Sequence, residues 1–219
     1  MTAQNSLTDA VQQGAADEVA RLLAEDPTLA DARHESGVSA MMLALYYQQS
    51  AIAEQIAALR EAFSMRELAA LGRTDELAAA LALEPEALDR PASDGFRLLG
   101  LASFFGHEST VERLLELGAD PILPSDNPTR VTALHSAVAF RDPEVGLANA
   151  RRLLAHGAAV DAPQQSGWTA LHSAAMHGNE PLVRLLLENG ADSSLGNDDG
   201  KKPSDLAAEA GHDTLIALL

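Results

Sequence analysis

The stretch GWTALHSAAMHGNEPLVRLLLENGAD, residues 167–192, carries most of the information about the fold. Thr169 predicts the start of a helix near Ala170, because a threonine hydroxyl can accept a hydrogen bond from an unpaired backbone N–H of the first turn. Gly178 predicts the end of that helix, and Pro181 is placed for the first turn of a second one. The stretch therefore predicts two short helices joined by a tight turn.

The second helix of this stretch has one apolar face. Leu182, Leu185 and Leu186 follow the i, i+3, i+4 spacing of an amphipathic helix. Gly190 predicts its end, and the residues ADSSLGNDDG that follow are typical of turns. A single pair of helices this short cannot bury its apolar face alone, so the pattern predicts a stack of similar pairs.

The rest of the chain repeats this pattern. GKKPSDLAAEAGHDTLIALL begins at Gly200, GFRLLGLASFFGHESTVERLLELGADP begins at Gly95, and RVTALHSAVAF spans residues 130–140. In the N-terminal part, GAADEVARLLAEDP from Gly14 is echoed by GRTDELAAALALEP from Gly72. Self-similarity at a fixed period indicates a repeat architecture.

These residues resemble the ankyrin-repeat family, whose unit reads roughly G-x-T-P-L-H-x-A-A-x-x-G-H and then an apolar helix ending L-L-x-x-G-A-D. The resemblance is strong at 131–192, clear at 95–120 and weaker at 200–219. It implies an all-α ankyrin-repeat solenoid of about seven helix-turn-helix units with short hairpin-like turns. We expect a single domain, 1–219, with repeats at about 5–36, 37–60, 61–94, 95–127, 128–163, 164–196 and 197–219.

The composition limits the partners. The net charge is −17, from 32 acidic and 15 basic residues, whereas binding to nucleic acid or an anionic membrane needs clustered Lys and Arg. We therefore expect neither partner. The acidic surface suits a basic protein partner or simply keeps the chain in solution. Cysteine is absent, which excludes disulfides, zinc-thiolate sites and thiol nucleophiles.

The sequence also suggests where the protein works. The N-terminus has no basic stretch followed by an apolar one, and no apolar run approaches the roughly 18 residues of a membrane span. We expect a cytoplasmic, stand-alone protein, and its alanine-rich, arginine-over-lysine composition suits a high-GC bacterial genome. A monomer is expected, with a dimer through the C-terminal end, at Leu218 and Leu219, as the alternative.

No catalytic, metal or cofactor site is expected. The resemblance implies structural roles for most of the seven histidines: His135 and His172 occupy the position of the TALH motif, while His107 and His212 follow helix-ending glycines. Phosphate-loop, dinucleotide-binding and nucleophile-elbow motifs are absent. We therefore predict a protein that is not an enzyme.

The aromatic residues give the sharpest functional prediction. The resemblance implies that partners bind the concave face formed by the first helices and the turn tips, and seven of the eight aromatics fall there. The predicted partner-binding residues are Tyr46, Tyr47, Phe96, Phe104, Phe105, Phe140, Trp168, Met176 and His177. We interpret them as anchors of a non-enzymatic protein-protein interaction module.

Several alternatives stay open at this point. One residue of each aromatic pair could instead pack between adjacent first helices. The runner-up function is an accessory or sensor protein that binds a peptide or small ligand in the same groove. The insertions at 120–130 and 143–150 are candidates for contact loops or for neutral insertions. Acidic residues at turn tips, Glu35, Asp94, Asp198 and Asp199, either favour a basic partner or merely form turns.

Overall fold

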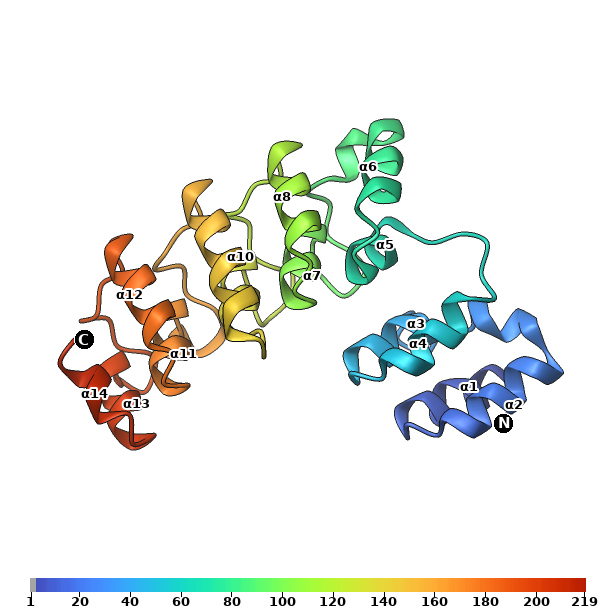
Figure 1. The fold of residues 1–219 in the computed structure, drawn as a ribbon, viewed down its shortest axis with the longest axis horizontal. Helices are drawn as coiled ribbons and strands as arrows, with labels where there is room; N and C mark the ends of the chain where they lie inside the picture. Colours follow the sequence, from blue (N-terminus) through green and yellow to red (C-terminus); the bar gives the residue numbers. More distant parts are fainter. Residues whose placement is uncertain (1–2) are drawn as a thin grey trace. The chain divides into compact units, whose positions relative to one another are not determined.

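The computed structural model describes residues 3–219, and this part of the chain is all-α, as predicted. It contains fourteen α-helices, three short 3-10 helices and no strand (Figure 1). The α-helices are α1 Ala3–Gln12, α2 Ala16–Glu25, α3 Ala40–Tyr46, α4 Ser50–Ala57, α5 Met65–Leu71, α6 Thr74–Leu83, α7 Leu98–Phe104, α8 Glu108–Glu116, α9 Ala133–Val138, α10 Pro143–Ala155, α11 Ala170–Met176, α12 Glu180–Glu188, α13 Pro203–Glu209 and α14 Asp213–Ile216. None of them is both long and apolar enough to cross a membrane.

The local signals in 167–192 act as expected. Thr169 precedes α11 and forms a capping box with His172, whose Nδ1 accepts a hydrogen bond from the Thr169 N–H at 3.1 Å. Gly178 takes the left-handed conformation (φ 68°) just after α11. Pro181 lies in the first turn of α12, and Leu182, Leu185 and Leu186 are buried. One repeat is therefore a short helix, a glycine turn and a second helix.

The contacts divide the chain into two compact units. The N-terminal unit runs to Glu67, and the C-terminal unit is Leu68–Leu219. The boundary lies inside α5, where the sequence alone predicted one continuous domain.

In the N-terminal unit, α1 packs on α2 and α3, and α4 packs on α2 and α3. A buried carboxylate closes this unit at its end. Glu67 accepts hydrogen bonds from the Ser39 hydroxyl (2.7 Å), from the Arg60 guanidinium (2.6 Å) and from the Ser64 N–H (2.8 Å). Burial alone would raise the pKa of Glu67, but these hydrogen bonds outweigh it and hold that pKa at about 2.

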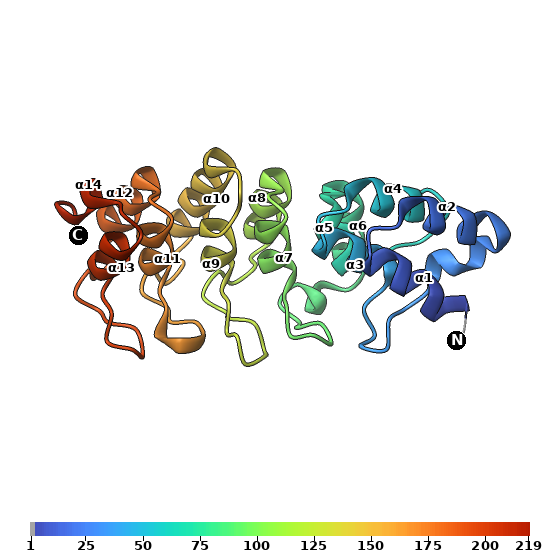
Figure 2. The ribbon, with the colours of Figure 1, turned by 90° about the horizontal axis from the view of Figure 1, so that it is seen from below.

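In the C-terminal unit, successive helix pairs stack side by side. The first helices pack in the order α7, α9, α11 and α13, and the second helices in the order α6, α8, α10 and α12 (Figure 1). The loops that lead into α7, α9, α11 and α13 project together on one side (Figure 2). The apolar residues between the two rows, such as Leu114, Leu153 and Leu186, are fully buried.

Backbone hydrogen bonds join the tips of these loops. The N–H of Asp126 donates to the carbonyl of Gly95 at 2.8 Å, and that of Gln165 donates to Thr129 at 2.9 Å. The N–H of Asp198 donates to the carbonyl of Ser166 at 3.0 Å. Each loop of the C-terminal unit is thus held by the next one along the chain.

The insertion at 143–150 is not a loop. It lengthens α10 to 13 residues, against 9 residues in each of α8 and α12. The Asp142 carboxylate caps this longer helix by accepting from the N–H groups of Glu144 (3.0 Å) and Val145 (3.3 Å). The insertion, which the sequence left open as a contact loop or a neutral insertion, forms helix instead of a loop, because an Asp-Pro pair starts a helix at this point.

Candidate binding site

Two predicted site residues, Tyr46 and Tyr47, end helix α3 in the N-terminal unit. The Tyr46 hydroxyl accepts a hydrogen bond from Arg66 at 2.7 Å, and the Arg66 guanidinium lies 5.9 Å from the centre of the Tyr46 ring. Tyr47 has 52% of its surface exposed. Gln48 follows in the left-handed conformation (φ 58°), as a glycine does after the first helix of other repeats. Of this pair, Tyr47 is thus the residue open to a partner.

Phe104 and Phe105 end helix α7 in the C-terminal unit. Their rings meet edge to face, with centres 5.0 Å apart, which is a favourable geometry for two aromatic rings. Phe104 is 46% exposed, whereas Phe105 is half-buried. One ring of the pair is therefore largely held against the protein, and the other faces solvent.

Phe140 lies eight residues after Thr132, which caps α9, as Phe105 lies eight residues after Arg97. Helix α9 is one residue shorter than α7 and ends at Val138. The Phe140 ring lies over Gly106, so close that a Cβ there would be 2.3 Å from the ring. Phe140 is half-buried, and its ring lies over the residue that follows Phe105. We call Phe104, Phe105 and Phe140 the phenylalanine cluster.

Met176 and His177 hold the corresponding positions at the end of α11. Met176 is half-buried and His177 is exposed. His177 Nδ1 donates a hydrogen bond to the carbonyl of Ser173 at 2.8 Å. The ring thus caps the end of its own helix. This repeat thus presents a thioether and an imidazole where the repeat of α7 presents two phenyl rings.

Phe96 and Trp168 lie at loop tips of the C-terminal unit, one before α7 and one before α11. Both are half-buried. The centres of the Trp168 and His172 rings are 6.0 Å apart. The backbone carbonyl of Trp168 accepts a hydrogen bond from His135 Nε2 at 3.2 Å. The predicted site residues of this unit therefore fall in two places, helix ends and loop tips.

The phenylalanine cluster has acidic neighbours. Glu108 starts α8 just after the cluster, and Glu144 is exposed in the first turn of α10. Arg152 of α10 pairs with Glu108 at 2.8 Å and with Glu112 at 3.4 Å, joining two second helices. Of these carboxylates, Glu108 and Glu112 share the single positive charge of Arg152, and Glu144 is exposed.

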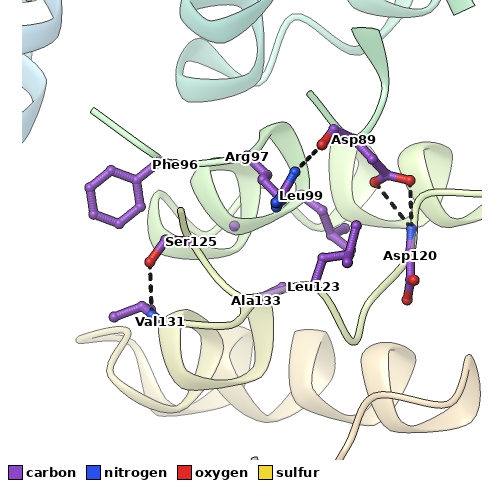
Figure 3. A pocket seen from close by; sticks show the side chains of 10 residues that line it. Asp89, Phe96, Arg97, Leu99, Asp120, Leu123, Ser125, Val131 and Ala133 are labelled. Carbon is purple, nitrogen blue, oxygen red and sulfur yellow. Dashed lines mark hydrogen bonds between the residues drawn. The ribbon is translucent and has the colours of Figure 1, made fainter. Parts of the chain in front are cut away.

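A small cavity next to Phe96 marks a departure from the repeat pattern. Arg97 and Gly100 stand where Thr132 and His135 stand in the next repeat. The Arg97 guanidinium takes over the cross-link. It donates to the carbonyl of Pro124 at 3.0 Å and to the carbonyl of Asp89 (Figure 3).

The space beside Gly100 is a cavity of about 10 Å³. This is the volume that one water molecule needs. The cavity is therefore too small to receive a ligand, and it does not support a small-molecule site beside Phe96.

His135 and His172 connect neighbouring repeats. His135 Nδ1 accepts from the N–H of Thr132 at 3.3 Å, and its Nε2 donates to Trp168 of the next repeat. His172 does the same with Thr169 and with the carbonyl of Lys201 at 3.1 Å. Burial lowers the pKa of His135 to about 4 and lowers the pKa of His172 as well. Both rings are neutral structural groups at neutral pH.

A cleft that the repeat pattern did not predict lies between two loop tips of the C-terminal unit. It has a volume of about 320 Å³ and is lined by Thr129, Val131, Gln164, Gln165, Ser166 and Trp168. Only Trp168 was predicted as a site residue. The signal that could have pointed there is the run Gln164-Gln165-Ser166, an uncharged polar stretch at a loop tip of an otherwise acidic chain.

The chain belongs to the ankyrin-repeat family. The family model described as "Ankyrin repeats (3 copies)" matches residues 99–195 and 146–219, which together make up more than half of the chain. Within the part of the chain that the structure describes, no group of three or more His, Cys, Asp or Glu residues is placed to hold a metal ion. Ankyrin repeats generally mediate interactions between proteins, and the family is typically non-enzymatic.

Several curated proteins share part of this sequence. The chain is 37% identical over 84 residues to protein phosphatase 1 regulatory subunit 27 of Mus musculus, covering 38% of this chain and 52% of that protein. It is 38% identical over 104 residues to the B-cell lymphoma 3 protein homolog of Mus musculus, covering 48% and 22%. It is 34% identical over 118 residues to a transient receptor potential cation channel subfamily A member 1 homolog of Caenorhabditis elegans, covering 54% and 9%. The chain thus spans about half or less of each of these relatives.

Proposed function

We propose that this protein is a non-enzymatic binding module that docks a partner protein on its exposed aromatic residues. The observation that carries the proposal is the phenylalanine cluster, in which Phe104 is 46% exposed and packs edge to face on Phe105 of the same repeat, while Phe140 of the next repeat lies over Gly106. Aromatic side chains on a fixed scaffold bind with little loss of conformational entropy. They are also the residues most often responsible for binding energy at interfaces.

The same proposal extends to the N-terminal unit. Tyr47 is an exposed aromatic at the end of a first helix, as Phe104 is in the C-terminal unit. The regulatory subunit among the relatives is by its name a protein that acts on another protein. We extend that mode of action, association without catalysis, to this chain.

We further propose that the partner segment at the phenylalanine cluster is basic. The chain carries a net charge of −17, and Glu144 is an exposed carboxylate in the first turn of α10, the helix that follows Phe140. A segment with an apolar anchor flanked by Lys or Arg would bury its anchor against Phe104 and keep its charges near acidic groups. A cytoplasmic location, a bacterial origin and a monomeric state stay predictions from the sequence.

The test is a capture experiment from a lysate of the source cells with three baits. The first is the unmodified chain, the second is Phe104→Ala, and the third is Leu83→Ala as a matched control, because Leu83 is an apolar residue of the same unit with 89% exposure. We expect one protein to be recovered by the first and third baits and lost with Phe104→Ala. Its binding is expected to weaken as salt is raised, because exposed charges are screened.

Two results would count against the proposal. Equal recovery by all three baits would show that the phenylalanine cluster is not the binding surface. Recovery that does not depend on salt would still support Phe104 as the anchor but would contradict the proposal that the partner segment is basic. Circular dichroism of each bait before use separates a lost contact from a lost fold.

A further inference from the structure

We infer that the C-terminal unit has an opening point between the helix pairs α9–α10 and α11–α12. From this boundary, helices α11 to α14 separate and unfold as one block. A stack of repeats ordinarily opens at its end, since a terminal pair has only one neighbour. Here the contacts between pairs change that order, because they hold α13–α14 to α11–α12 more firmly than they hold α11–α12 to α9–α10.

The first difference concerns rings that lie over turns. Three glycines that follow first helices each have a ring of the next pair within 2.5 Å of the place where a Cβ would be. The glycines and rings are Gly72 with His107, Gly106 with Phe140 and Gly178 with His212. His107 and His212 directly follow the turn glycine of their own pair, and the α11–α12 pair has Asn179 at this position. The Asn179 side chain accepts from the N–H of Leu182 in its own helix at 3.2 Å. This pair therefore has no ring at this position to lay over the turn between α9 and α10.

The second difference concerns carboxylates that join neighbouring loops. The N–H of Asp120, in the loop before α9, donates to the carboxylate of Asp89 at 3.2 Å. The N–H of Asp192, in the loop before α13, donates to the carboxylate of Asp161 at 3.1 Å. In the loop before α9 the position of Asp161 is taken by Ile122, since each lies four residues after a glycine that follows a second helix. An isoleucine side chain cannot accept a hydrogen bond, so the loop before α11 has no such carboxylate to bind.

Ion pairs between second helices point in the same direction. Arg152 of α10 pairs with Glu108 at 2.8 Å and with Glu112 at 3.4 Å, both in α8. Arg184 of α12 pairs with Glu180 of its own helix at 2.7 Å. Among the described residues, no ion pair joins α10 to α12. An exposed ion pair adds little stability, but what it adds here holds α10 to α8 and not to α12.

The last two boundaries share their remaining type of cross-link. His135 Nε2 donates to the carbonyl of Trp168 at the first of them, and His172 Nε2 donates to the carbonyl of Lys201 at the second. Because these bonds are alike, the ring and the carboxylate make the difference, and both are found at the final boundary. The pair α13–α14 therefore stays with α11–α12 when the stack opens.

Opening at this boundary would divide the predicted contact residues of the C-terminal unit. Trp168, Met176 and His177 belong to the block that unfolds, whereas the phenylalanine cluster belongs to the part that stays folded. A partner that touches both parts would hold the boundary closed, because it binds the closed state alone. This consequence rests on the proposed function, and the opening itself does not.

The experiment is native-state hydrogen exchange of the full-length chain at a series of urea concentrations below the unfolding transition, which gives an opening free energy for each helix. Ile122→Asp places a carboxylate at the position that Asp161 holds in the next loop. Ile122→Ala is the matched control, which removes the same exposed side chain without adding an acceptor. Asp161→Ala removes the carboxylate from the final boundary, and circular dichroism checks the fold of each variant.

We expect the amides of α11 to α14 to share one opening free energy, lower than that of α7 to α10. Ile122→Asp is expected to slow exchange in the block about ten-fold relative to Ile122→Ala, and Asp161→Ala to let α13–α14 open before α11–α12. In the unmodified chain, exchange of α13–α14 ahead of α11–α12 would overturn the inference, and so would one common opening free energy from α7 to α14. Equal exchange in the two Ile122 variants would count against it too. These results leave the proposed function untouched, because they are measured without a partner.

Discussion

Arg130 holds a backbone conformation that glycine holds at the same place in neighbouring repeats. It lies two residues before Thr132, which caps α9, as Gly95 and Gly167 lie two residues before Arg97 and Thr169. Arg130, Gly95 and Gly167 all have positive φ. The value is 51° at Arg130, 84° at Gly95 and 71° at Gly167. An arginine pays a steric cost there that glycine does not.

Replacing Arg130 by glycine is therefore expected to stabilise the protein. The side chain is exposed, so its removal breaks little packing. We expect Arg130→Gly to raise the free energy of unfolding by about 0.5–1 kcal/mol, measured by urea denaturation. Gly167→Ala is the matched opposite change, since a Cβ there would be 2.7 Å from the Asp198 carboxylate, and it should lower the free energy of unfolding. A loss of stability in Arg130→Gly would show that the guanidinium makes a contact worth more than the strain.

The sequence predicted the residues that follow the repeat pattern and missed the ones that replace it. The turn glycines could be predicted from spacing, because the same residue type recurs, and the roles of His135 and His172 followed from the resemblance to the family. Glu67 could not, although it stands at the third position of α5 as His135 does in α9. A carboxylate there forms a capping box with Ser64 and accepts from Arg60, and neither partner belongs to the pattern.

Helix α10 has a polar residue at a buried position where the neighbouring second helices, α8 and α12, have residues that suit the core. Asn149 is fully buried, and neither polar atom of its amide has a hydrogen-bond partner among the described residues. It lies eight residues before Gly157, the position that Leu182 holds before Gly190 and Thr110 holds before Gly118. The Thr110 hydroxyl is bonded to that of Thr74 at 2.8 Å. Asn149 is therefore the unsatisfied member of this row.

Asn149→Leu is expected to increase stability, because it removes two unpaired polar atoms and places in α10 the residue found in α12. We expect the free energy of unfolding to rise by about 1–3 kcal/mol in urea denaturation. Asn149→Asp, which keeps the size and adds a buried charge, should lower it. If Asn149→Leu were the less stable variant, the amide would be shown to contribute a bond that offsets its burial.

The lengths of helices were harder to predict than their existence. The four residues inserted between the two helices of the fifth repeat extend α10, and α9 ends one residue early. Spacing alone gives the number of extra residues but not whether they form a loop. The Asp142-Pro143 pair was the local signal for a helix start. Because α9 ends one residue early, Phe140 is the second residue after its helix, and its ring lies over Gly106.

At the scale of the whole molecule, the buried histidines that join neighbouring repeats make the free energy of unfolding depend on pH. Native His135 stays neutral down to a pKa of about 4 because burial disfavours its charged form, whereas a histidine in an unfolded chain takes up a proton below about pH 6.5. Between these values the unfolded state binds more protons than the folded state. The free energy of unfolding therefore falls as the pH falls through this window. Burial also lowers the pKa of His172, so this residue likewise lowers the free energy of unfolding as the pH falls.

We expect urea denaturation to show this loss between about pH 6.5 and about pH 4, at roughly 1.4 kcal/mol per pH unit from His135. His135→Gln should be less stable at neutral pH and should show a shallower dependence in the same window. Glu67, with its pKa at about 2, does not contribute there, since it is ionised in both states over most of the window. A stability that rises on acidification through this window would contradict the assignment.

The repeat pattern predicted the order of seven helix pairs but not the division into two compact units. The boundary falls at Glu67, in the third repeat, after a second repeat that the sequence already marked as short. Only 7 residues, 58–64, separate α4 from α5. A count of residues does not say whether such a segment continues a stack, because that depends on side-chain contacts such as those of Arg60.

The bonds between loop tips also bear on how the C-terminal unit would respond to force. Each tip is held to the next by single main-chain bonds, Gly95 to Asp126, Thr129 to Gln165 and Ser166 to Asp198, and each repeat packs on its immediate neighbours. Tension along the chain would then load one boundary between repeats at a time. The unit would lengthen in steps as one repeat after another unfolds, and it would shorten in steps as the repeats refold when the tension is released.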